Sequence, residues 1–242
     1  GCQFVNEHDG EITIYSLKDF SILHMEKKVV KNGKKVNFID EWFEDTGKRM
    51  YDRFGCHPKN CPNNEYNMWI PFKALTHTYT EDRTLENLSF KRTFESVEEK
   101  CEAGFMWFCN HLMNIICDGN EPAYKFFLLW LSQMIQYPEN KSIEIIVCSK
   151  PGAGKDLLLS FIKQMIGKEP KTWECADPQK EVFGDFNDQM KDAFLVVMPE
   201  SDKSCFYNCT SKKKQIITNP TININIKNVK KFTMPSYHRF LE

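Results

Sequence analysis

The fold of this chain is decided by residues 142–167, which read SIEIIVCSKPGAGKDLLLSFIKQMIG. The apolar run Ile143–Val147 predicts a buried strand, and the small residues of Ser149–Gly154 predict a turn. Apolar side chains recur at helical spacing through Asp156–Ile166, so we expect a helix directly after the turn. A strand, a glycine turn and a helix in this order form the setting in which proteins bind phosphate groups.

The turn contains the groups that phosphate binding requires. Gly152 and Gly154 allow backbone N–H groups to curl around a phosphate, and the start of the helix adds the positive end of its dipole. Lys155 can reach the outer phosphates of a nucleotide and is our first candidate catalytic residue. We expect ATP and Mg²⁺ as cofactors. The predicted nucleotide-binding residues are Pro151, Gly152, Ala153, Gly154, Lys155 and Asp156.

The loop departs from the pattern G-x-x-x-x-G-K-[ST] at both ends. Its first position is Ser149, and its last is Asp156, where a hydroxyl group ordinarily binds Mg²⁺. A carboxylate also binds this hard cation, but it places negative charge beside the triphosphate. Nucleotide binding is therefore better supported than hydrolysis, and a glycine turn in an ordinary strand-to-helix unit is the simpler alternative.

A second nucleotide motif is expected in the segment 192–200, DAFLVVMPE. Its apolar strand ends in Glu200, and a carboxylate at that end of a strand can hold Mg²⁺ through water and polarise an attacking water. We predict Glu200 as catalytic and, with Asp156, as a magnesium ligand; Asp202 is a helper. The alternative is a charged residue that ends a core strand.

A basic segment extends from Lys203 to Lys231, with seven lysines and no Asp or Glu. Within it, Thr221–Lys227 alternates strictly between polar and apolar residues, which predicts a strand with one buried face and one polar, basic face. Asn228 permits a turn toward Lys230 and Lys231. Such a hairpin suits nucleic-acid phosphates. The alternative is a solvated edge strand whose lysines deter aggregation.

The region before the loop separates into two parts. In residues 1–98, Glu11–Tyr15 alternates like a strand, Val29–Phe38 predicts a hairpin that turns at Asn32-Gly33, and Trp42–Tyr51 fits a short helix. Cysteine and histidine residues between 56 and 61 suggest a zinc knuckle, but no second ligand pair follows at metal-site spacing, so a proline-rich loop is favoured.

Two helices are expected between residues 97 and 137. Apolar residues recur at three- and four-residue steps, Asp118-Gly119-Asn120 breaks the pattern, and Tyr124–Ile135 makes the second helix. His111 lies in the first helix and is interpreted as an ordinary helix residue, because the sequence places no partner beside it.

Composition narrows the class of protein. The 41% hydrophobic and 13% aromatic shares are enough for a sizeable core, and a net charge of −1 excludes a globally basic surface. Ten cysteines are scattered through apolar runs, which favours reduced thiols in an intracellular protein. The sequence shows no signal peptide and no membrane span. We expect three regions: an accessory module at 1–98, a helical segment at 99–141 and an ATPase core at 142–242.

An ordered series of motifs supports a family resemblance. The series comprises His111-Leu112, Leu129-Trp130-Leu131, Gln136-Tyr137-Pro138, Gly152–Lys155, Phe186-Asn187, the strand that ends at Glu200, Lys214–Thr218, the strand to Lys227, and Tyr237–Phe240. It resembles the superfamily 3 helicase core of the primase-helicases of poxviruses and other large DNA viruses, shared with phages and virophages. The similarity covers roughly residues 100–242, with a weaker part in Trp42–Trp69.

The resemblance implies an α/β fold with an AAA+-like P-loop NTPase core, preceded by the helical hairpin and a small α+β module. It implies a homo-hexamer in the full-length protein that hydrolyses ATP to move along single-stranded or forked DNA in viral DNA replication. A primase domain in the same polypeptide and a site of action in the host cytoplasm or nucleus are further expectations. Gly152, Gly154 and Lys155 fall on Walker A and Glu200 on Walker B. The implied nucleic-acid-binding residues are Lys214, Lys227, Lys230 and Lys231.

Two departures leave other functions open. Asp156 replaces the hydroxyl residue, and the chain ends about where the family's polar sensor and arginine finger would follow, so we expect a core truncated at its C-terminus. One alternative is a catalytically degenerate nucleic-acid-binding or assembly module. Another is a small-molecule or nucleotide kinase, which would need a second substrate pocket and a lid.

Overall fold

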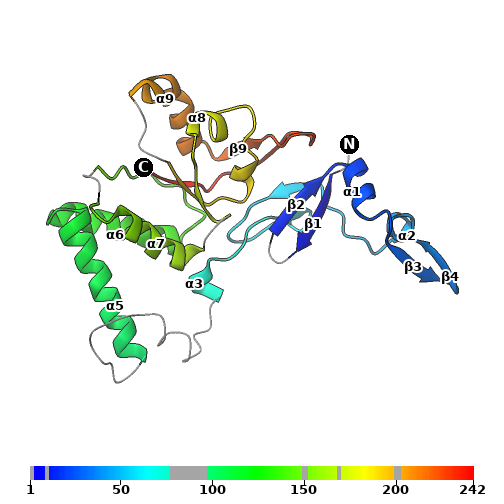
Figure 1. The fold of residues 1–242 in the computed structure, drawn as a ribbon, viewed down its shortest axis with the longest axis horizontal. Coiled ribbons are helices and arrows are strands. Elements are labelled where there is room, and N and C mark those ends of the chain that lie inside the picture. Colours follow the sequence, from blue (N-terminus) through cyan, green and yellow to red (C-terminus); the bar gives the residue numbers. More distant parts are fainter. Residues whose placement is uncertain (1–2, 9–10, 77–96, 149–151, 168–169, 199–202) are drawn as a thin grey trace. The chain divides into compact units, whose positions relative to one another are not determined.

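The computed structural model describes residues 3–8, 11–76, 97–148, 152–167, 170–198 and 203–242 (Figure 1). The described residues form a mixed α/β fold with several small sheets, which confirms the expected fold class at this level. The chain divides into two compact units that interleave along the sequence. Unit 1 comprises Gly1–Ile70, Cys175–Asp192 and Ser201–Ser236; unit 2 comprises Pro71–Glu174, Ala193–Glu200 and Tyr237–Glu242.

A parallel sheet lies at the centre of unit 2. Ile145 forms a parallel bridge with Leu241, and the N–H of Val147 donates to the carbonyl of Glu242 at 2.7 Å. The predicted strand before the glycine turn therefore runs beside β11 (Arg239–Leu241), although its regular pairing is limited to the bridge at Ile145. The order from this segment is β11, β8, β7. The strands are β7 (Thr172–Glu174), β8 (Leu195–Val197) and β11 (Arg239–Leu241).

The parallel arrangement determines where the connecting loops lie. The side chains of Leu195 and Val196 are fully buried, as expected for a strand covered on both faces. Because all four segments point the same way, their C-terminal ends meet at one edge of the sheet. Ligands of open α/β sheets bind in the crevice at this edge.

The helices of unit 2 confirm the predicted pair before the loop. α5 (Val97–His111) continues into the π-helical η1 (Leu112–Ile116), and α6 (Glu121–Gln136) follows. Asp118 and Gly119 interrupt the helical conformation, because their φ angles are 49° and 73°. Asn120 then caps α6, because its side chain accepts a 3.0 Å hydrogen bond from the N–H of Ala123. The other helices in the described part of this unit are α3 (Lys73–Thr76) and α7 (Lys155–Ile166).

One buried arginine joins several elements of unit 2. The Arg239 side chain has no exposed surface, and its guanidinium donates to the carbonyl of Tyr237 at 3.2 Å, to Oε1 of Gln133 at 3.3 Å and to the carbonyl of Asn140. It also lies over the ring of Phe194. Burial lowers the pKa of Arg239 to about 10, an effect that Glu139 opposes. This arginine is therefore a structural member of unit 2.

Unit 1 contains the predicted N-terminal hairpin, formed by β3 (Lys28–Lys31) and β4 (Lys34–Asn37), and the predicted strand β2 (Glu11–Tyr15). Asn32 and Gly33 have φ angles of 51° and 77°, which suits the tight turn expected there. The helix predicted for Trp42–Tyr51 is wrong in its bounds: it starts at Phe38 and ends at Glu44. The elements of this part are β1 (Phe4–His8), β2 (Glu11–Tyr15), α1 (Leu17–Leu23), β3 (Lys28–Lys31), β4 (Lys34–Asn37), α2 (Phe38–Glu44), β5 (Arg53–Gly55) and β6 (Glu65–Asn67).

The cysteine- and histidine-bearing loop of unit 1 is organised around a carboxylate. The buried Glu65 side chain pairs with Nε2 of His57 at 2.7 Å and with Nε of Arg53 at 2.7 Å. The hydrogen bond from His57 is the main reason that the pKa of Glu65 lies below its usual range. Within the described part of the chain, no three His, Cys, Asp or Glu side chains are grouped to hold a metal ion.

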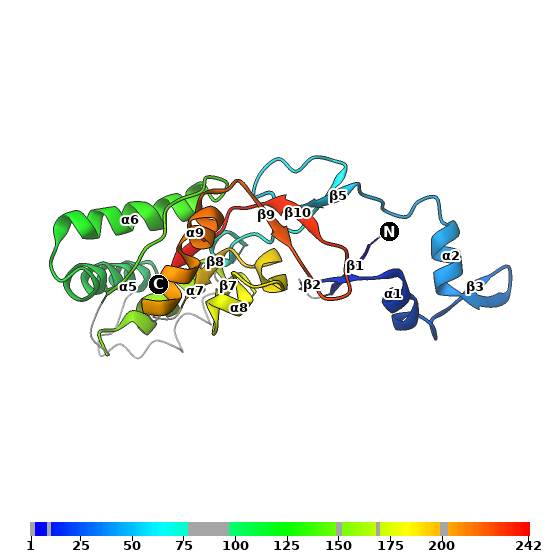
Figure 2. The same ribbon diagram turned by 90° about the horizontal axis from the view of Figure 1, so that it is seen from above.

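The C-terminal part of unit 1 contains a two-stranded ribbon, two short helices and one longer helix. β9 (Thr221–Ile224) and β10 (Phe232–Pro235) pair antiparallel, with Thr233 opposite Asn223. β10 also lies beside β5, where the rings of Phe232 and Phe54 are 4.8 Å apart (Figure 2). The elements are α8 (Pro178–Glu181), the 3₁₀ helix η2 (Asp188–Lys191), α9 (Lys203–Thr218), β9 (Thr221–Ile224) and β10 (Phe232–Pro235). Among the described helices of either unit, none has the length and apolar character of a membrane span.

Candidate phosphate-binding loop and basic hairpin

The glycine turn has the backbone conformation that its sequence predicts. Gly152 and Gly154 have φ angles of 79° and 84°, in the left-handed region that favours glycine. A side-chain carbon added at Gly152 would meet no atom of the described residues within 4 Å. The first loop residues, 149–151, which include the predicted contact Pro151, lie outside the described residues.

The turn leads directly into the N-terminus of α7. Gly154 is the residue before the helix, and the N–H of Leu158 donates to its carbonyl at 3.2 Å. The N–H groups of Lys155, Asp156 and Leu157 come before Leu158 in the first turn of α7, and N–H groups at this position have no acceptor within a helix. They lie at the positive end of a helix of 12 residues. The loop therefore offers several backbone donors together with one lysine.

Most of the predicted loop residues belong to the described part of the chain, whereas the predicted catalytic acid Glu200 does not. Lys155 is half-buried at the first position of α7, and Asp156 is exposed in its first turn. β8 ends at Val197, at the sheet edge where the Ile145 segment also ends. Glu200 follows in sequence and, with its helper at position 202, lies outside the described residues.

His111 contacts the loop, which the sequence did not predict. Its Nε2 lies 3.3 Å from the carbonyl oxygen of Gly154. Since a carbonyl oxygen only accepts, Nε2 is the donor in this hydrogen bond. The ring of Trp107 stacks on the imidazole at 5.5 Å with 8° between the planes. The spacing of four residues predicts that the two rings meet on α5, but it does not indicate the loop partner.

The contact is supported by packing between α5 and α7. Phe108 is buried, and its ring stacks on that of Phe161 with centroids 4.1 Å apart. Leu158 and Ile162 are buried on the predicted apolar face of α7. The same helix that begins at the loop is thus held against the helix that contains His111.

The lysines predicted to bind nucleic acid belong to two elements of unit 1. Lys227, Lys230 and Lys231 are exposed in and beside the connection between β9 and β10, where Asn228 turns the chain with a φ of 65°. Lys214 is exposed on α9. Ile222 and Ile224 are buried, so the predicted alternation is confirmed, although regular pairing ends at Ile224 rather than at Lys227.

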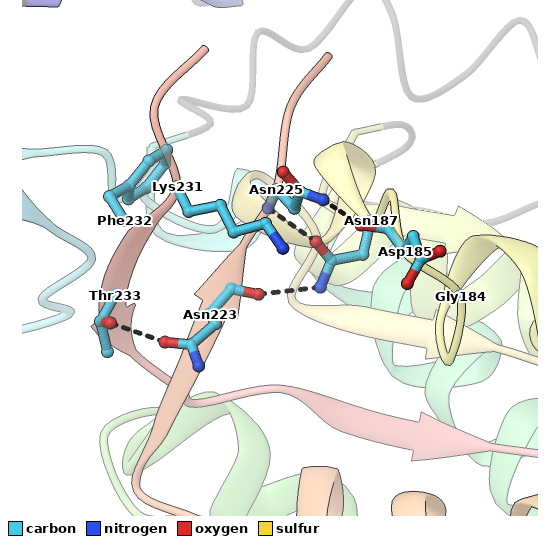
Figure 3. Close-up of a pocket in the computed structure, with 8 residues that line it drawn as sticks. All are labelled: Gly184, Asp185, Asn187, Asn223, Asn225, Lys231, Phe232 and Thr233. Carbon is cyan, nitrogen blue, oxygen red and sulfur yellow. Dashed lines mark hydrogen bonds between the residues drawn. The ribbon is translucent and has the colours of Figure 1, made fainter. Parts of the chain in front are cut away.

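A pocket of about 400 Å³ opens beside this hairpin (Figure 3). Asn187 joins η2 to β9: its Nδ2 donates to the carbonyl of Asn223 at 3.0 Å, and its Oδ1 accepts from the N–H of Asn225 at 2.9 Å. The positions of Asn187, Asn223 and Asn225 in the sequence do not predict these hydrogen bonds. The lining residues are Gly184, Asp185, Asn187, Asn223, Asn225, Lys231, Phe232 and Thr233.

Comparisons with known proteins add the following. Residues 147–241 match a family of unknown function, DUF5906. No curated protein matches the chain. The apo structure of the NrS-1 C-terminal region (305–718) has a TM-score of 0.61 at 17% identity, and the match covers 99% of this chain and 51% of that one. The A form apo structure of the same region has a TM-score of 0.63 at 17% identity, with 99% and 50% coverage. The chain thus spans about half the length of the NrS-1 structures it matches and is similar to them in fold.

Proposed function

We propose that this chain is the nucleotide-binding part of an ATP-dependent DNA helicase of the superfamily 3 type that acts in DNA replication. In this proposal the loop at 149–156 binds ATP with Mg²⁺, and the β9–β10 hairpin binds single-stranded DNA. Hydrolysis and movement along DNA belong to a homo-hexamer of the full-length protein. The NrS-1 likeness supports the fold, and the order of motifs along the sequence supports the assignment of function.

The observation that carries the proposal is the loop itself. Gly152 and Gly154 adopt left-handed conformations between the end of a parallel strand and the first residue of a helix, and that residue is Lys155. Backbone amides, the helix dipole and an ammonium group are thereby available at the edge of the sheet where α/β proteins bind ligands. This combination suits a group with several negative charges, such as a triphosphate.

The residues present also fit a magnesium ion. Asp156 is exposed in the first turn of α7, and carboxylate oxygen is a ligand that Mg²⁺ prefers. Glu200 is proposed as the second acid. When bound, the ion would neutralise charge on the phosphate oxygens.

The residues of the chain then have separate roles. The amides of the loop hold the phosphates in place, and the Lys155 ammonium neutralises charge that develops on the outer phosphate. Glu200 orients the attacking water and accepts its proton. His111 positions the loop through its hydrogen bond to the carbonyl of Gly154.

The hairpin supplies the proposed contact to DNA. Lys227, Lys230 and Lys231 are exposed close together in sequence around one turn, and lysines in this arrangement bind phosphates without regard to sequence. Lys214 on α9 adds a further cation of the same unit.

Affinity for nucleotide tests the central part of the proposal. A fluorescent ATP analogue titrated with the full chain and Mg²⁺ should bind, and Lys155→Ala should weaken binding at least about tenfold, since a charge-assisted contact is lost. Lys125→Ala removes an exposed lysine from α6 of the same unit and should leave the affinity unchanged. Equal affinity in Lys155→Ala and Lys125→Ala would contradict the proposal.

One observation favours a second candidate, a module that binds nucleotide without turnover. Asp156 adds negative charge at the position where a hydroxyl ordinarily binds the metal. The variant Asp156→Ser separates the two functions in the full-length protein. Turnover that appears only in the variant indicates a degenerate ATPase, whereas turnover that is lost indicates that Asp156 is a working ligand.

A further inference from the structure

We infer that the pocket beside the basic hairpin binds one nucleotide of the single strand and prefers a base with an exocyclic amino group, such as cytosine, over thymine. The inference rests on the proposed DNA binding by the hairpin. It adds a site that reads the base, which the exposed lysines alone do not provide.

The pocket has the size and rigidity for such a ligand. Its volume of about 400 Å³ falls within the range of small-molecule sites. Asn187 is buried, and both ends of its carboxamide are used in the bonds to Asn223 and Asn225. The side chain of Asn225 is held in turn, because its Nδ2 donates to the carbonyl of Asp185. One wall of the pocket is therefore fixed by internal hydrogen bonds.

The groups left for a ligand are a cation, an amide and a carboxylate. Asn223 uses Oδ1 to accept a 2.6 Å bond from Thr233, so its Nδ2 keeps donors for a ligand. Lys231 is exposed, and among the described residues its ammonium makes no ion pair or hydrogen bond. Asp185 is also exposed, and its carboxylate can only accept.

The arrangement of these groups matches the two ends of a nucleotide. Figure 3 shows Lys231 reaching from the hairpin toward the Asn225–Asn187 pair, with Asp185 on the other side of that pair. A phosphate is expected at the ammonium of Lys231, which donates hydrogen bonds. The base edge is expected at Asp185, which accepts from an amino group.

The carboxylate of Asp185 determines which base the pocket prefers. Cytosine presents an N4 amino donor where thymine presents the O4 acceptor, and carboxylates accept from cytosine N4. If the carboxylate of Asp185 faced O4 of thymine, two hydrogen-bond acceptors would face each other without a donor between them. The same pocket therefore stabilises cytosine and disfavours thymine.

Binding of two homopolymers tests the inference. Labelled oligonucleotides of about 12 dC or dT residues, within the usual range of single-strand site sizes, are titrated with the full chain by fluorescence anisotropy. We expect the dC strand to bind at least about tenfold more tightly, the effect of one hydrogen bond to a charged group. Asp185→Asn should reduce this ratio to about one, because a carboxamide both donates and accepts.

Two further variants serve as controls. Asp188→Asn makes the same change of charge three residues away, outside the pocket, so it should retain the dC preference. Lys231→Gln should weaken the binding of both strands. It should also reduce, by about one, the steepness with which the logarithm of the binding constant falls with the logarithm of the salt concentration.

The possible failures are distinguishable. Equal binding of the two strands by the unaltered chain, or an unaltered ratio in Asp185→Asn, would overturn the base-reading pocket alone. Absence of binding to both strands would overturn the hairpin assignment as well, while nucleotide binding by the Lys155 loop would be judged by its own titration.

Discussion

His111 donates a hydrogen bond from its Nε2 to the carbonyl oxygen of Gly154, 3.3 Å away, and so links the end of α5 to the turn before α7. The two residues are 43 positions apart. The carbonyl of Gly154 also accepts the first helical hydrogen bond, from Leu158. A single backbone group thus joins the loop, the helix it begins and the neighbouring helix, so the conformation of the loop depends on the position of His111.

Replacement of His111 by alanine is predicted to loosen the loop and weaken nucleotide binding about five- to tenfold, the effect of one lost hydrogen bond. His111→Gln, whose amide also donates, should restore part of the affinity. Asn110→Ala, an exposed neighbour on the same helix, is the matched control. Calorimetric titration with ATP and Mg²⁺ measures these affinities, and wild-type binding by His111→Ala would show that the contact has no role in the loop.

Alanine at Gly154 is predicted to be more harmful than alanine at Gly152. Both positions have positive φ, which costs about 1–2 kcal/mol for a residue with a side chain. At Gly154 the new carbon would also lie 2.6 Å from Cε1 of His111, whereas at Gly152 it would meet no atom of the described part of the chain within 4 Å. Thermal unfolding and ATP affinity should both fall further in Gly154→Ala. The double variant with His111→Ala should recover part of the difference, and strict additivity would contradict the steric explanation.

Local patterns predicted much of this fold, and tertiary contacts account for what they missed. Helical spacing and glycine or asparagine turns correctly indicated α7, the α5–α6 pair and the Asn32-Gly33 hairpin. The run Ile143–Val147 was predicted as a strand, but its regular pairing depends on β11, nearly a hundred residues later, and is limited to Ile145. The sequence of Ile143–Val147 does not show how many of its backbone groups form hydrogen bonds with a neighbouring strand.

The candidate sites show the same division. The glycines and Lys155 were found from their spacing, because phosphate binding imposes a local pattern. The contact of His111 depends on how α5 packs on α7, and the polar pocket depends on Asn187 meeting a strand 36 residues away. Neither relationship has a local signal, so each required the structure.

Arg239 is predicted to be essential for the stability of unit 2. Replacement by methionine removes the charge and leaves Oε1 of Gln133 without its donor, while the carbonyl of Asn140 keeps only its bond from Nε2 of Gln133. We expect a cost of about 3 kcal/mol in the free energy of unfolding. Arg239→Lys should recover only part of this, since an ammonium cannot reproduce the planar fork. Guanidinium denaturation measures the loss. Arg49→Met, which changes an exposed arginine of unit 1, is the control, and an equal loss in both variants would contradict the prediction.

Lys141 is predicted to make the stability of unit 2 depend on pH. Burial, followed by the positive charge of Arg239, lowers the pKa of Lys141 from 10.5 to about 8. Between these values the unfolded chain binds more protons than the folded chain, so the free energy of unfolding rises with pH. The rise should begin as the pH passes about 8 and continue toward the unfolded pKa.

Comparison with Lys141→Met isolates this effect from other groups that titrate in the same range. Chemical denaturation at about pH 7 and about pH 9.5 should show a gain for the unaltered chain, relative to the variant, at the higher pH. Lys125→Met, which removes an exposed lysine, should follow the unaltered chain. A relative loss at the higher pH would mean that Lys141 is stabilised in its charged form.

Amide hydrogen exchange of the loop measures whether its backbone N–H groups bind a triphosphate. If the backbone N–H groups around Gly154 and Lys155 bind a triphosphate, peptides that span residues 152–158 should exchange more slowly when ATP and Mg²⁺ are added, and this protection should disappear in Lys155→Ala. Exchange of these peptides that is unchanged by saturating ATP would contradict the account, because the amides would then have no phosphate to bind.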